Sequence, residues 1–416
     1  MRSGPATLRP APPFRPSKAA SARHQVGSAW RVTVLLGAVL LGVVGCNRTS
    51  RSTPLPYQEL SPGISYAHER IPKEPWSIHV VRVERNRPDF EVHTLPAPGR
   101  GLGLVPLSEQ LRAWPAQRGV PVAAINGDFY ERDGPFAGDP RGLQIVDGEF
   151  VSQPSGGVAF WVGPDRRIGA GPVSARWEAI WPEGLRFPVE LNAARSTNAL
   201  ALYSPTGVRS THTTTGPEWV LEGTDPASAR LTPGSSPTLR VVEVRKTGNT
   251  PLRPGVLVLS APPRFTPPVP PLAVGDTVRL SLTTEPPLPG VTAAIGGGPI
   301  LVHQGRPRKI EPPSEESYIF SSMTERHPRS AVGWDEQYLY LVTVDGRQEG
   351  VSVGMSLDEL ARYLAGLGIQ EAMTLDGGGS ATVWSEGQVR NSPCDGEERP
   401  VANVLMVVRS PASAGR

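Results

Sequence analysis

Asp376 stands at the end of an apolar run and is followed directly by Gly377, Gly378, Gly379 and Ser380, in the sequence LDGGGSA. Glycine admits positive φ angles and lets a ligand approach the backbone, and consecutive backbone N–H groups can together bind an anion. A tight bend between two core strands is the alternative, but it accounts less readily for three glycines beside a carboxylate and a hydroxyl. The motif therefore predicts a site that combines Asp376 with anion-binding backbone.

Three further motifs supply groups that can bind a polar ligand. VDGRQEG sets Asp345 two residues before Arg347, and INGDFY sets Asn126 two residues before Asp128, so each pair lies on one side of an extended chain. HPRSAVGW adds Arg329, whose planar guanidinium suits a bidentate contact with phosphate. Asp-Gly and Asn-Gly are also ordinary turn sequences, and surface arginines are common, so the alternative is that these residues serve turns and surface only.

Other kinds of site are excluded or left open by the sequence. The chain has no GxxxxGK[ST] loop and no credible GxGxxG fingerprint for nucleotides. Its two cysteines are too few for a zinc ribbon or a cysteine-based metal cluster, and we expect no disulfide. The glycines of AIGGG (294–298) have no carboxylate beside them in the sequence. No cofactor is required, although separate aspartates beside a phosphate would also suit Mg²⁺ or Ca²⁺, so a divalent cation stays open.

A strand, a helix and a second strand must position two of these motifs. YLYLVTV (338–344) has the pattern of a strand, and Ser356 with Glu359 three residues later forms the capping box of a helix with one apolar side. IQEAMTL (369–375) is the next predicted strand. If the two strands are parallel, as a helical crossover favours, DGR and DGGGS leave the same edge of one sheet.

The rest of the chain is predicted to be rich in short strands. LSEQLRAW has a capping-box start at Ser108 and predicts a short helix, which leads into a strand ending at INGDFY. From about 140 to 290, short apolar or alternating runs lie between Gly, Pro and Asn turns, and Gly and Pro together exceed a fifth of the 416 residues. We expect an α+β fold with a mixed β-sheet core, packed helices and a β-rich middle region.

Residues 1–45 are typical of an export leader, with a basic flank, about 14 apolar residues and small residues before a cut. VVGC resembles a lipobox, so Cys46 is expected to carry lipid; a buried cysteine beside an uncleaved anchor is the alternative. Residues 46–75 would be a flexible tether, 76–408 the folded domain and 409–416 a disordered tail. These features predict a cell-envelope protein, lipid-anchored to a bacterial membrane and facing the periplasm or the exterior.

The formal net charge of +3 does not indicate a nucleic-acid partner. The leader holds six of the 42 basic residues and no acidic ones, so the remainder, with 39 acidic residues, is net acidic. A basic face is the usual footprint of nucleic-acid binding, and the folded part of the chain lacks the charge for it.

Between residues 76 and 408 the chain resembles the phosphodiester glycosidase family. The motifs that occur in the family's order are AAINGDFY, RGLQIVDGEFV, AIGGGPILVHQG, HPRSAVGW, VTVDGR, GMSLDELARYLAGLG, AMTLDGGGSATVW and RPVANVLMVV. Many relatives have Asn where Thr374 stands, and the middle region matches loosely. Substrate specificity therefore does not follow from the resemblance.

The resemblance implies hydrolysis of a sugar 1-phosphodiester at the anomeric carbon. Such a reaction passes through an oxocarbenium-like state that two carboxyl groups normally serve. The candidate catalytic residues are Asp128, Asp345 and Asp376, with Asp376 placed near the anomeric carbon and Asp345 orienting Arg347. The candidate ligands of substrate and phosphate are Asn126, Arg329, Arg347, Gly377, Gly378, Gly379 and Ser380.

Two other functions also fit the sequence. One is a non-catalytic glycan-binding lipoprotein in exopolysaccharide biosynthesis or export. The other is a metal-dependent phosphodiesterase that breaks a P–O bond in place of a C–O bond. In each case the expected partners are a carbohydrate phosphodiester and, through the lipid, a membrane.

Overall fold

The computed structural model describes residues 54–97, 102–266, 268–311 and 318–411. The leader, Cys46 and residues 412–416 lie outside these ranges, so the lipid anchor and most of the predicted tail stay predictions. The described residues all belong to one compact unit. Within the described ranges no helix combines the length and the apolar character needed to span a membrane.

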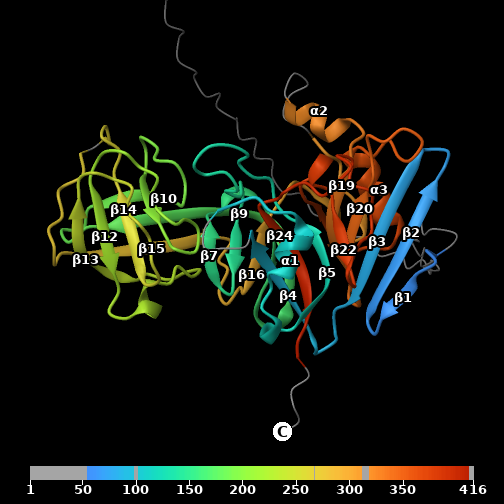
Figure 1. The fold of residues 1–416 in the computed structure, drawn as a ribbon, viewed down its shortest axis with the longest axis horizontal. Coiled ribbons are helices and arrows are strands. Elements are labelled where there is room, and N and C mark those ends of the chain that lie inside the picture. The colour runs from blue at the N-terminus through green and yellow to red at the C-terminus, as the bar shows by residue number, and fades with distance from the viewer. Residues whose placement is uncertain (1–53, 98–101, 267, 312–317, 412–416) are drawn as a thin grey trace, which may run out of the picture. The chain divides into compact units, whose positions relative to one another are not determined.

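Three β-sheets build this unit (Figure 1). The first has eight strands, which in order across the sheet are β1 (Gln58–Ser61), β2 (Ile64–Ile71), β3 (Trp76–Glu84), β20 (Tyr338–Val344), β19 (Arg329–Trp334), β21 (Glu371–Thr374), β17 (Ile300–His303) and β18 (Arg306–Pro307). The second has five, which are β23 (Gln388–Val389), β22 (Val383–Ser385), β5 (Val120–Asn126), β24 (Asn403–Arg409) and β4 (Phe90–Pro96).

The third sheet contains most of the middle of the chain. Its eleven strands, in order, are β10 (Arg186–Leu191), β11 (Leu200–Tyr203), β14 (Val256–Ser260), β12 (Glu218–Glu222), β13 (Thr238–Arg245), β15 (Thr277–Glu285), β9 (Ile168–Ile180), β8 (Ser155–Val162), β16 (Ala293–Gly296), β6 (Gln144–Val146) and β7 (Glu149–Ser152). Because β10 also pairs with β9, the strands from β10 to β9 close into a barrel. The barrel interior is apolar, as in β15, where Val278, Leu280 and Leu282 are buried and alternate with polar residues.

A shared core joins the three sheets next to the predicted site. Buried side chains from β3, β5, β8, β16, β19 and β24 meet in one cluster, in which Ile125, Phe160 and Val332 are fully enclosed. Apolar burial of this kind is the main term that favours folding, at about 1.5–3 kcal/mol for each large aliphatic or aromatic side chain. The core therefore fixes the ends of strands that belong to different sheets.

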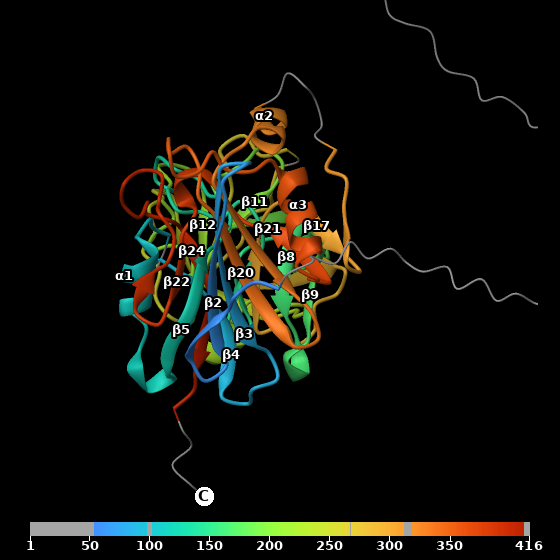
Figure 2. The ribbon, with the colours of Figure 1, turned by 90° about the vertical axis from the view of Figure 1, so that its right-hand side faces the viewer.

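The predicted α+β fold with packed helices is wrong. The described residues contain three short α-helices, α1 (Leu107–Arg112), α2 (Tyr318–Thr324) and α3 (Leu357–Gly366), together with 3₁₀ turns of three or four residues. The sheets bury their apolar faces mainly against one another, while α3 covers the outer face of the first sheet and α1 packs on β5 and β24 of the second (Figure 2). A mostly β architecture results, because frequent Gly and Pro keep most segments too short for a helix.

The capping prediction holds for α3 and fails for α1. The Ser356 hydroxyl accepts a hydrogen bond from the Glu359 N–H, and the Glu359 carboxylate accepts one from the Ser356 N–H, which completes the capping box. Leu357, Leu360 and Leu364 of this helix are buried. Helix α1 instead begins after Pro106, so Ser108 lies inside its first turn and caps nothing.

The folded unit begins before Trp76. Strands β1 and β2 lie within the range 46–75 that we expected to be a flexible tether, and β2 pairs with β3 along its whole length, from Ile64 opposite Val83 to Ile71 opposite Trp76. Ile64 is fully buried in the shared core. The polar and proline-rich composition of this segment concealed the strand ISYAHERI, which lies between β1 and β3 and buries Ile64 and Ala67.

The strand–helix–strand unit delivers its two loops to one edge of the first sheet. Strand β19 lies between β20 and β21 and pairs antiparallel with both, so β20 and β21 run parallel. The loops that begin at Asp345 and Asp376 therefore leave the same edge, as predicted. Strand β5 of the second sheet ends beside them, because the Asp376 N–H donates to the Gly127 carbonyl at 2.9 Å.

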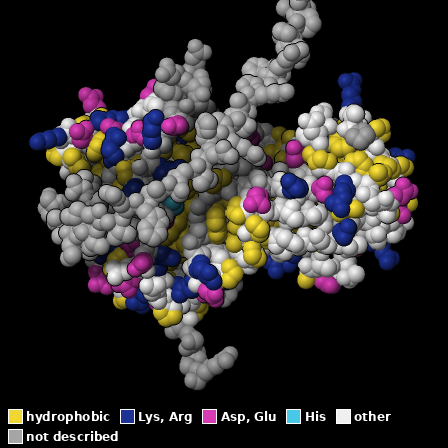
Figure 3. Space-filling view, turned by 180° about the vertical axis from the view of Figure 1, so that it is seen from behind, with side chains coloured by type: hydrophobic (Ala, Val, Ile, Leu, Met, Phe, Trp, Pro, Cys, Tyr) yellow, Lys and Arg dark blue, Asp and Glu magenta, His cyan; other side chains and the backbone are white. Residues whose placement is uncertain are grey.

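Acidic and basic side chains are interspersed over the face of the unit that Figure 3 shows, with apolar patches between them. On this face the arginines and lysines do not gather into a continuous basic surface. This distribution agrees with a folded part of the chain that carries slightly more acidic than basic residues.

Candidate active site

Asn126, the last residue of β5, joins three segments of the site. Its Nδ2 donates to the Asp376 carbonyl at 2.7 Å. Its Oδ1 accepts hydrogen bonds from the Ser330 hydroxyl at 2.6 Å and from the Thr382 N–H at 3.1 Å. The side chain is fully buried, so it cannot contact a substrate as we expected. Asn126 instead holds Asp376 in place.

Replacing Asn126 with alanine is expected to destabilise the protein by about 2–4 kcal/mol, because three buried hydrogen-bonding groups lose their partner. Urea unfolding followed by tryptophan fluorescence measures the change. Asn86→Ala is the control, since Asn86 is exposed and makes one long hydrogen bond, to the Glu336 carbonyl at 3.3 Å. Equal stability of the two variants would contradict a clamping role for Asn126.

Asp128 is buried two residues beyond Asn126, with 3% of its surface exposed. Its Oδ1 accepts a hydrogen bond from the Phe129 N–H at 2.8 Å, and its Oδ2 accepts one from the Gly142 N–H at 2.7 Å. Burial raises the pKa of Asp128 to about 7, against the effect of these two donors, and the negative charge of Asp376 adds to the rise. At neutral pH a large fraction of the Asp128 carboxyl is thus protonated and able to donate a proton.

Two glycines make room for the Asp128 carboxylate. A Cβ on Gly296 would lie 2.3 Å from Asp128 Oδ2, and one on Gly142 would lie 2.8 Å from the same atom. Gly296 is the first glycine of AIGGG, which has no carboxylate beside it in the sequence. The fold provides that carboxylate from a distant segment.

Gly296→Ala is therefore expected to lower stability by about 1–3 kcal/mol and to displace Asp128, since the carboxylate is held on its other side by two N–H groups. Thermal unfolding and turnover of a sugar 1-phosphodiester measure the two effects. Gly366→Ala, in α3, is the control because an added Cβ there meets no atom within 4 Å. Wild-type stability and turnover in Gly296→Ala would contradict the close fit.

Asp376 is half-buried beside Asp128. Burial raises the pKa of Asp376 to about 6, while the Ser380 hydroxyl and the positive charges of Arg399 and Arg132 lower it. At neutral pH the Asp376 carboxylate is mostly ionised. The site thus holds two coupled carboxyl groups of which one is the better proton donor and the other the better anion.

The Ser380 hydroxyl is a buried polar group without a protein partner of good geometry. It lies near the Asp376 carboxylate and the Tyr130 hydroxyl, but within the part of the chain that the structure describes it completes no hydrogen bond. The Tyr130 hydroxyl donates to the Pro400 carbonyl at 3.0 Å. A buried hydroxyl in this situation is available to a bound water or ligand.

Three arginines that we did not single out from the sequence surround the two carboxyl groups. The positive charge of Arg141 lowers the pKa of Asp128. The charges of Arg399 and Arg132 lower the pKa of Asp376. Arg399 is fixed by Asp395, whose Oδ2 lies 2.9 Å from Nε and 2.7 Å from Nη2. Arg399 is the first residue of the motif RPVANVLMVV, so the sequence did contain a signal for its role. Arg132 follows Asp128 by four residues in an irregular loop, where the spacing of residues does not indicate which side chains meet.

The glycines after Asp376 make room for protein groups more than for an anion. A Cβ on Gly377 would meet the Pro328 carbonyl at 2.6 Å, and the Gly378 N–H donates to that same carbonyl at 2.9 Å. The prediction that the N–H groups of Gly377, Gly378 and Gly379 bind an anion is therefore wrong for Gly378. A Cβ on Gly379 would lie 1.9 Å from Nη2 of Arg399. Bare backbone here lets the Arg399–Asp395 pair approach Asp376.

Arg347 lies over Gly378 at the exposed edge of the site. A Cβ on Gly378, which has a φ of +61°, would be 3.3 Å from Arg347 Nη1. Arg347 itself adopts a φ of 57°, and its Nη2 lies 3.3 Å from His327 Nδ1. The guanidinium is exposed and can meet a phosphate at the rim.

We expected the Arg329 guanidinium to bind the phosphate of a substrate, but it binds backbone carbonyls instead. The side chain is 7% exposed, and it donates from Nε to the Met355 carbonyl at 2.7 Å and from Nη2 to the Ser322 and Glu325 carbonyls at 2.7 and 2.8 Å. Burial, together with the charge of Arg347, lowers the pKa of Arg329 to about 10. Arg329 holds α2 and the start of α3 against the sheet.

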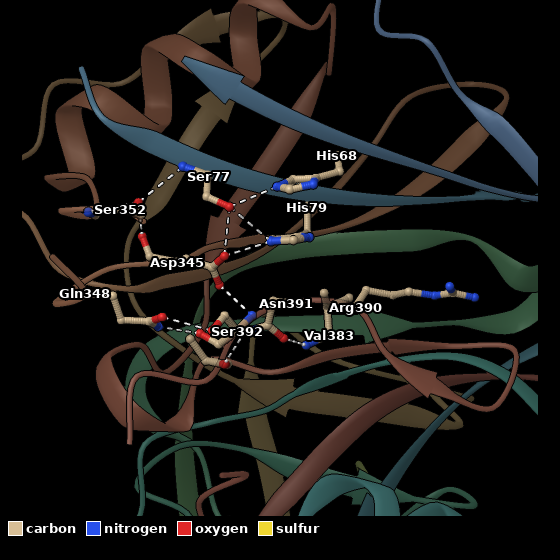
Figure 4. A network of polar contacts seen from close by, with 12 residues as sticks. His68, Ser77, His79, Asp345, Gln348, Ser352, Val383, Arg390, Asn391 and Ser392 are labelled. Atoms are coloured by element: carbon tan, nitrogen blue, oxygen red, sulfur yellow. Dashed lines mark hydrogen bonds and ion pairs between the residues drawn. The ribbon is translucent and has the colours of Figure 1, made fainter. Parts of the chain in front are cut away.

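Asp345 belongs to a buried network of polar groups that includes Ser77, His79 and Ser392 (Figure 4). Its Oδ2 is 2.8 Å from both Ser77 Oγ and His79 Nε2, and its Oδ1 accepts a hydrogen bond from the Ser392 N–H at 2.9 Å. Although burial raises the pKa of Asp345, the hydrogen bond with His79 and the other donors bring it below its ordinary value. Asp345 therefore anchors the loop at Ser392 and makes no bond to Arg347.

The described residues contain no group of three or more His, Cys, Asp or Glu side chains arranged to hold a metal ion together. The charge of Asp376 raises the pKa of Asp128, and burial raises the pKa of Asp139 to about 7 as well. Nothing in the chemistry proposed below requires a metal.

Comparisons with known proteins bear on the family and on the fold. Residues 241–408 match the family model described as phosphodiester glycosidase. The chain is 34% identical over 119 residues to N-acetylglucosamine-1-phosphodiester alpha-N-acetylglucosaminidase of Bos taurus, a match that covers 27% of this chain and 22% of that protein. It is 32% identical over 108 residues to the SPbeta prophage-derived uncharacterized protein YomE of Bacillus subtilis, covering 26% of this chain and 16% of that protein.

The crystal structure of a hypothetical protein from Synechocystis shares the fold, with a TM-score of 0.68 and 23% identity over 86% of this chain and 64% of that one. The chain spans about a fifth of the length of the curated relatives it matches. The family match includes Asp376, Arg347 and Arg399 but begins after Asp128. It confirms, for residues 241–408, the resemblance of the motifs to the phosphodiester glycosidase family.

Proposed function

We propose that the protein hydrolyses sugar 1-phosphodiesters by breaking the bond between the anomeric carbon and the phosphate oxygen. One observation supports this proposal more strongly than any other. Asp128 and Asp376 are coupled carboxyl groups whose pKa values burial raises to about 7 and about 6, at the meeting point of two sheets. A pair of carboxyl groups with separated roles is the usual equipment for cleavage at an anomeric carbon.

In this reaction the protonated Asp128 carboxyl donates its proton to the bridging oxygen as the C–O bond breaks, and a phosphate monoester leaves. The ionised Asp376 carboxylate stabilises the oxocarbenium-like carbon by its negative charge, and water supplies the hydroxyl that ends on that carbon. The second proton of the water returns to the Asp128 carboxylate. Proton donation of this kind contributes about 10²–10⁴-fold to a rate.

The arginines around the two carboxyl groups suit the phosphate of the same substrate. Arg399 is close to Asp376 and is fixed by Asp395, while Arg347 is exposed at the rim above Gly378. A guanidinium donates two parallel hydrogen bonds to a phosphate, and a positive charge favours the departing monoester. The N-acetylglucosamine-1-phosphodiester named in the Bos taurus relative supports this substrate class.

We further propose that the enzyme acts in the cell envelope on envelope or extracellular glycans, anchored through lipid on Cys46. The leader and VVGC support this placement. Mass spectrometry of the N-terminal peptide from membranes of a bacterial host tests it. A diacylglyceryl modification on Cys46 is expected, and an unmodified Cys46 in the mature protein would refute it.

Hydrolysis in ¹⁸O-labelled water tests the bond that is broken. With an N-acetylglucosamine 1-phosphodiester as substrate, we expect the label in the released sugar, and turnover that a chelator leaves unchanged. Label in the phosphate would replace the proposal with P–O cleavage by a phosphodiesterase. Saturable binding of the substrate without turnover, across a panel of sugars, would replace it with a binding role. Proton NMR of the first-formed anomer reports retention or inversion.

A further inference from the structure

The strands that carry the candidate active site have a cavity at their opposite end. It has a volume of about 590 Å³ and is bounded by the end of β3, the start of β4, the turn between β8 and β9, and the start of β20. Strand β24 touches the site with Asn403 and this cavity with Val407, so the two are separated by about 13 Å along one strand. We call it the distal cavity.

The floor of the distal cavity is apolar because it is an opening into the shared core. Val92 and Ile168 line the cavity and are partly exposed, and they pack on core residues of that cluster, which also includes Phe90, Val162 and Leu339. An apolar ligand over Val92 and Ile168 would remove their exposed apolar surface from water. The floor thus favours an aliphatic chain over a sugar.

The rim of the distal cavity carries two arginines without acidic partners. Among the described residues, neither Arg85 nor Arg166 forms an ion pair with a carboxylate. Each has one guanidinium N–H bonded to a backbone carbonyl, Arg85 to Asp335 and Arg166 to Phe90. Other N–H groups of each guanidinium remain for a ligand.

The remaining charged groups at the cavity are largely matched with one another. Arg118 pairs with Asp147 at 2.7 Å, His93 lies 3.2 Å from Glu91, and Asp165 is 3.7 Å from Arg167, while Glu84 is exposed at the mouth. Burial lowers the pKa of Arg85, the nearby Asp335 opposes this, and the like charge of Arg166 adds to the lowering. Both arginines line the same cavity.

The turn that presents Arg166 has an uncommon backbone. Asp165 and Arg166 are consecutive non-glycine residues with φ angles of 55° and 62°, in the left-handed region. Such conformations concentrate at functional sites, because the rest of the fold must hold them in place. Here the turn holds a cation over an apolar floor.

We propose that the distal cavity binds an amphipathic anion, with a carboxylate or phosphate head between Arg85 and Arg166 and an aliphatic chain against Val92 and Ile168. Fatty acids and lipids with a single phosphate share this chemistry. The site is separate from the carboxyl pair and does not depend on the reaction proposed for it.

Calorimetric titration of the full chain, below the micelle concentration of each probe, tests the proposal. Decanoate and decyl phosphate distinguish the two head groups, decanol has the chain alone, and inorganic phosphate has the head alone. We expect one saturable site for decanoate, decyl phosphate or both, with decanol and inorganic phosphate weaker by at least about 10-fold. No saturable binding, or decanol binding as tightly as either anion, would overturn the proposal.

Two variants locate the binding. Arg166→Gln is expected to weaken the anion that binds by at least about 10-fold, because one charge-assisted contact is lost. Arg167→Gln is the matched control, since Arg167 is exposed in the same turn and lies outside the cavity lining. Thermal unfolding of both confirms that the turn remains folded. Equal weakening in the two variants, or none in Arg166→Gln, would place the ligand elsewhere and refute the site.

Discussion

Asp376→Asn is expected to lower turnover of a sugar 1-phosphodiester by about 10²–10⁴-fold, since it removes the negative charge that faces the anomeric carbon. The same change is expected to stabilise the fold at pH 8 by about 1–3 kcal/mol. The reason is that burial raises the pKa of Asp376 to about 6, so the folded protein holds this charge at a cost. The asparagine amide preserves the shape of the side chain without the charge.

The pH dependence of this stability difference has a definite sign. A carboxyl group with a raised pKa favours the folded state while it is protonated, and that contribution is lost as the pH rises from about 4 through about 6. Wild type and Asp376→Asn should thus converge in stability near pH 4 and separate above pH 6. Urea unfolding across this range measures the difference.

Asp133→Asn is the control for both measurements, because Asp133 is an exposed aspartate in the loop that follows Asp128. It should leave turnover and stability unchanged. Loss of stability in Asp376→Asn at every pH would show that Asp376 serves the fold and would remove it from the mechanism. Full turnover in that variant would do the same.

Asp128→Asn is expected to lower turnover by about 10²–10⁴-fold at pH 6, where the wild-type carboxyl is mostly protonated and can donate. The wild-type enzyme should show a bell-shaped rate profile. Its acidic limb reflects Asp376 with a pKa of about 6, and its alkaline limb reflects Asp128 with a pKa of about 7. The residual activity of Asp128→Asn should lack the alkaline limb.

Substrates with better leaving groups separate a proton donor from a structural residue. A sugar 1-phosphodiester whose phosphate carries an aryl group needs less protonation of the bridging oxygen than one with an alkyl group. The loss in Asp128→Asn should therefore be smaller for the aryl diester. A loss of equal size for both, with the alkaline limb retained, would refute the assignment of Asp128 as the acid.

Local sequence signals predicted the elements that they govern. The capping box of Ser356 and Glu359 involves residues three apart, and it places α3 correctly. The parallel arrangement of β20 and β21 follows from a short helical crossover, so the shared edge of Asp345 and Asp376 could also be inferred. These features depend on neighbours within about 40 residues.

The fold class and parts of the site depend on contacts between distant segments, and there the sequence was insufficient. Whether a strand is covered by a helix or by another sheet is decided by packing across the whole chain, and the first and second sheets pack on β8 and β16 of the third. In the same way, Asp128 contacts Gly296, which is 168 residues away in the sequence. Arg329 donates its hydrogen bonds to backbone carbonyls near α2 and α3. From its residue type alone, Arg329 was predicted to bind phosphate, whereas in the structure it forms hydrogen bonds that hold the fold together.

The barrel of the third sheet enters and leaves the rest of the fold at a single point. Strands β9 and β15 pair from Ser174 opposite Glu285 to Ile180 opposite Arg279, so the two ends of the intervening segment, 181–278, are neighbours. A segment with adjacent ends can be exchanged for another module without changing the path of the chain elsewhere, provided that the module replaces the contacts of this segment with Val151 and Gln153. Evolution could thus vary the barrel as a replaceable insert while the carboxyl pair is inherited intact.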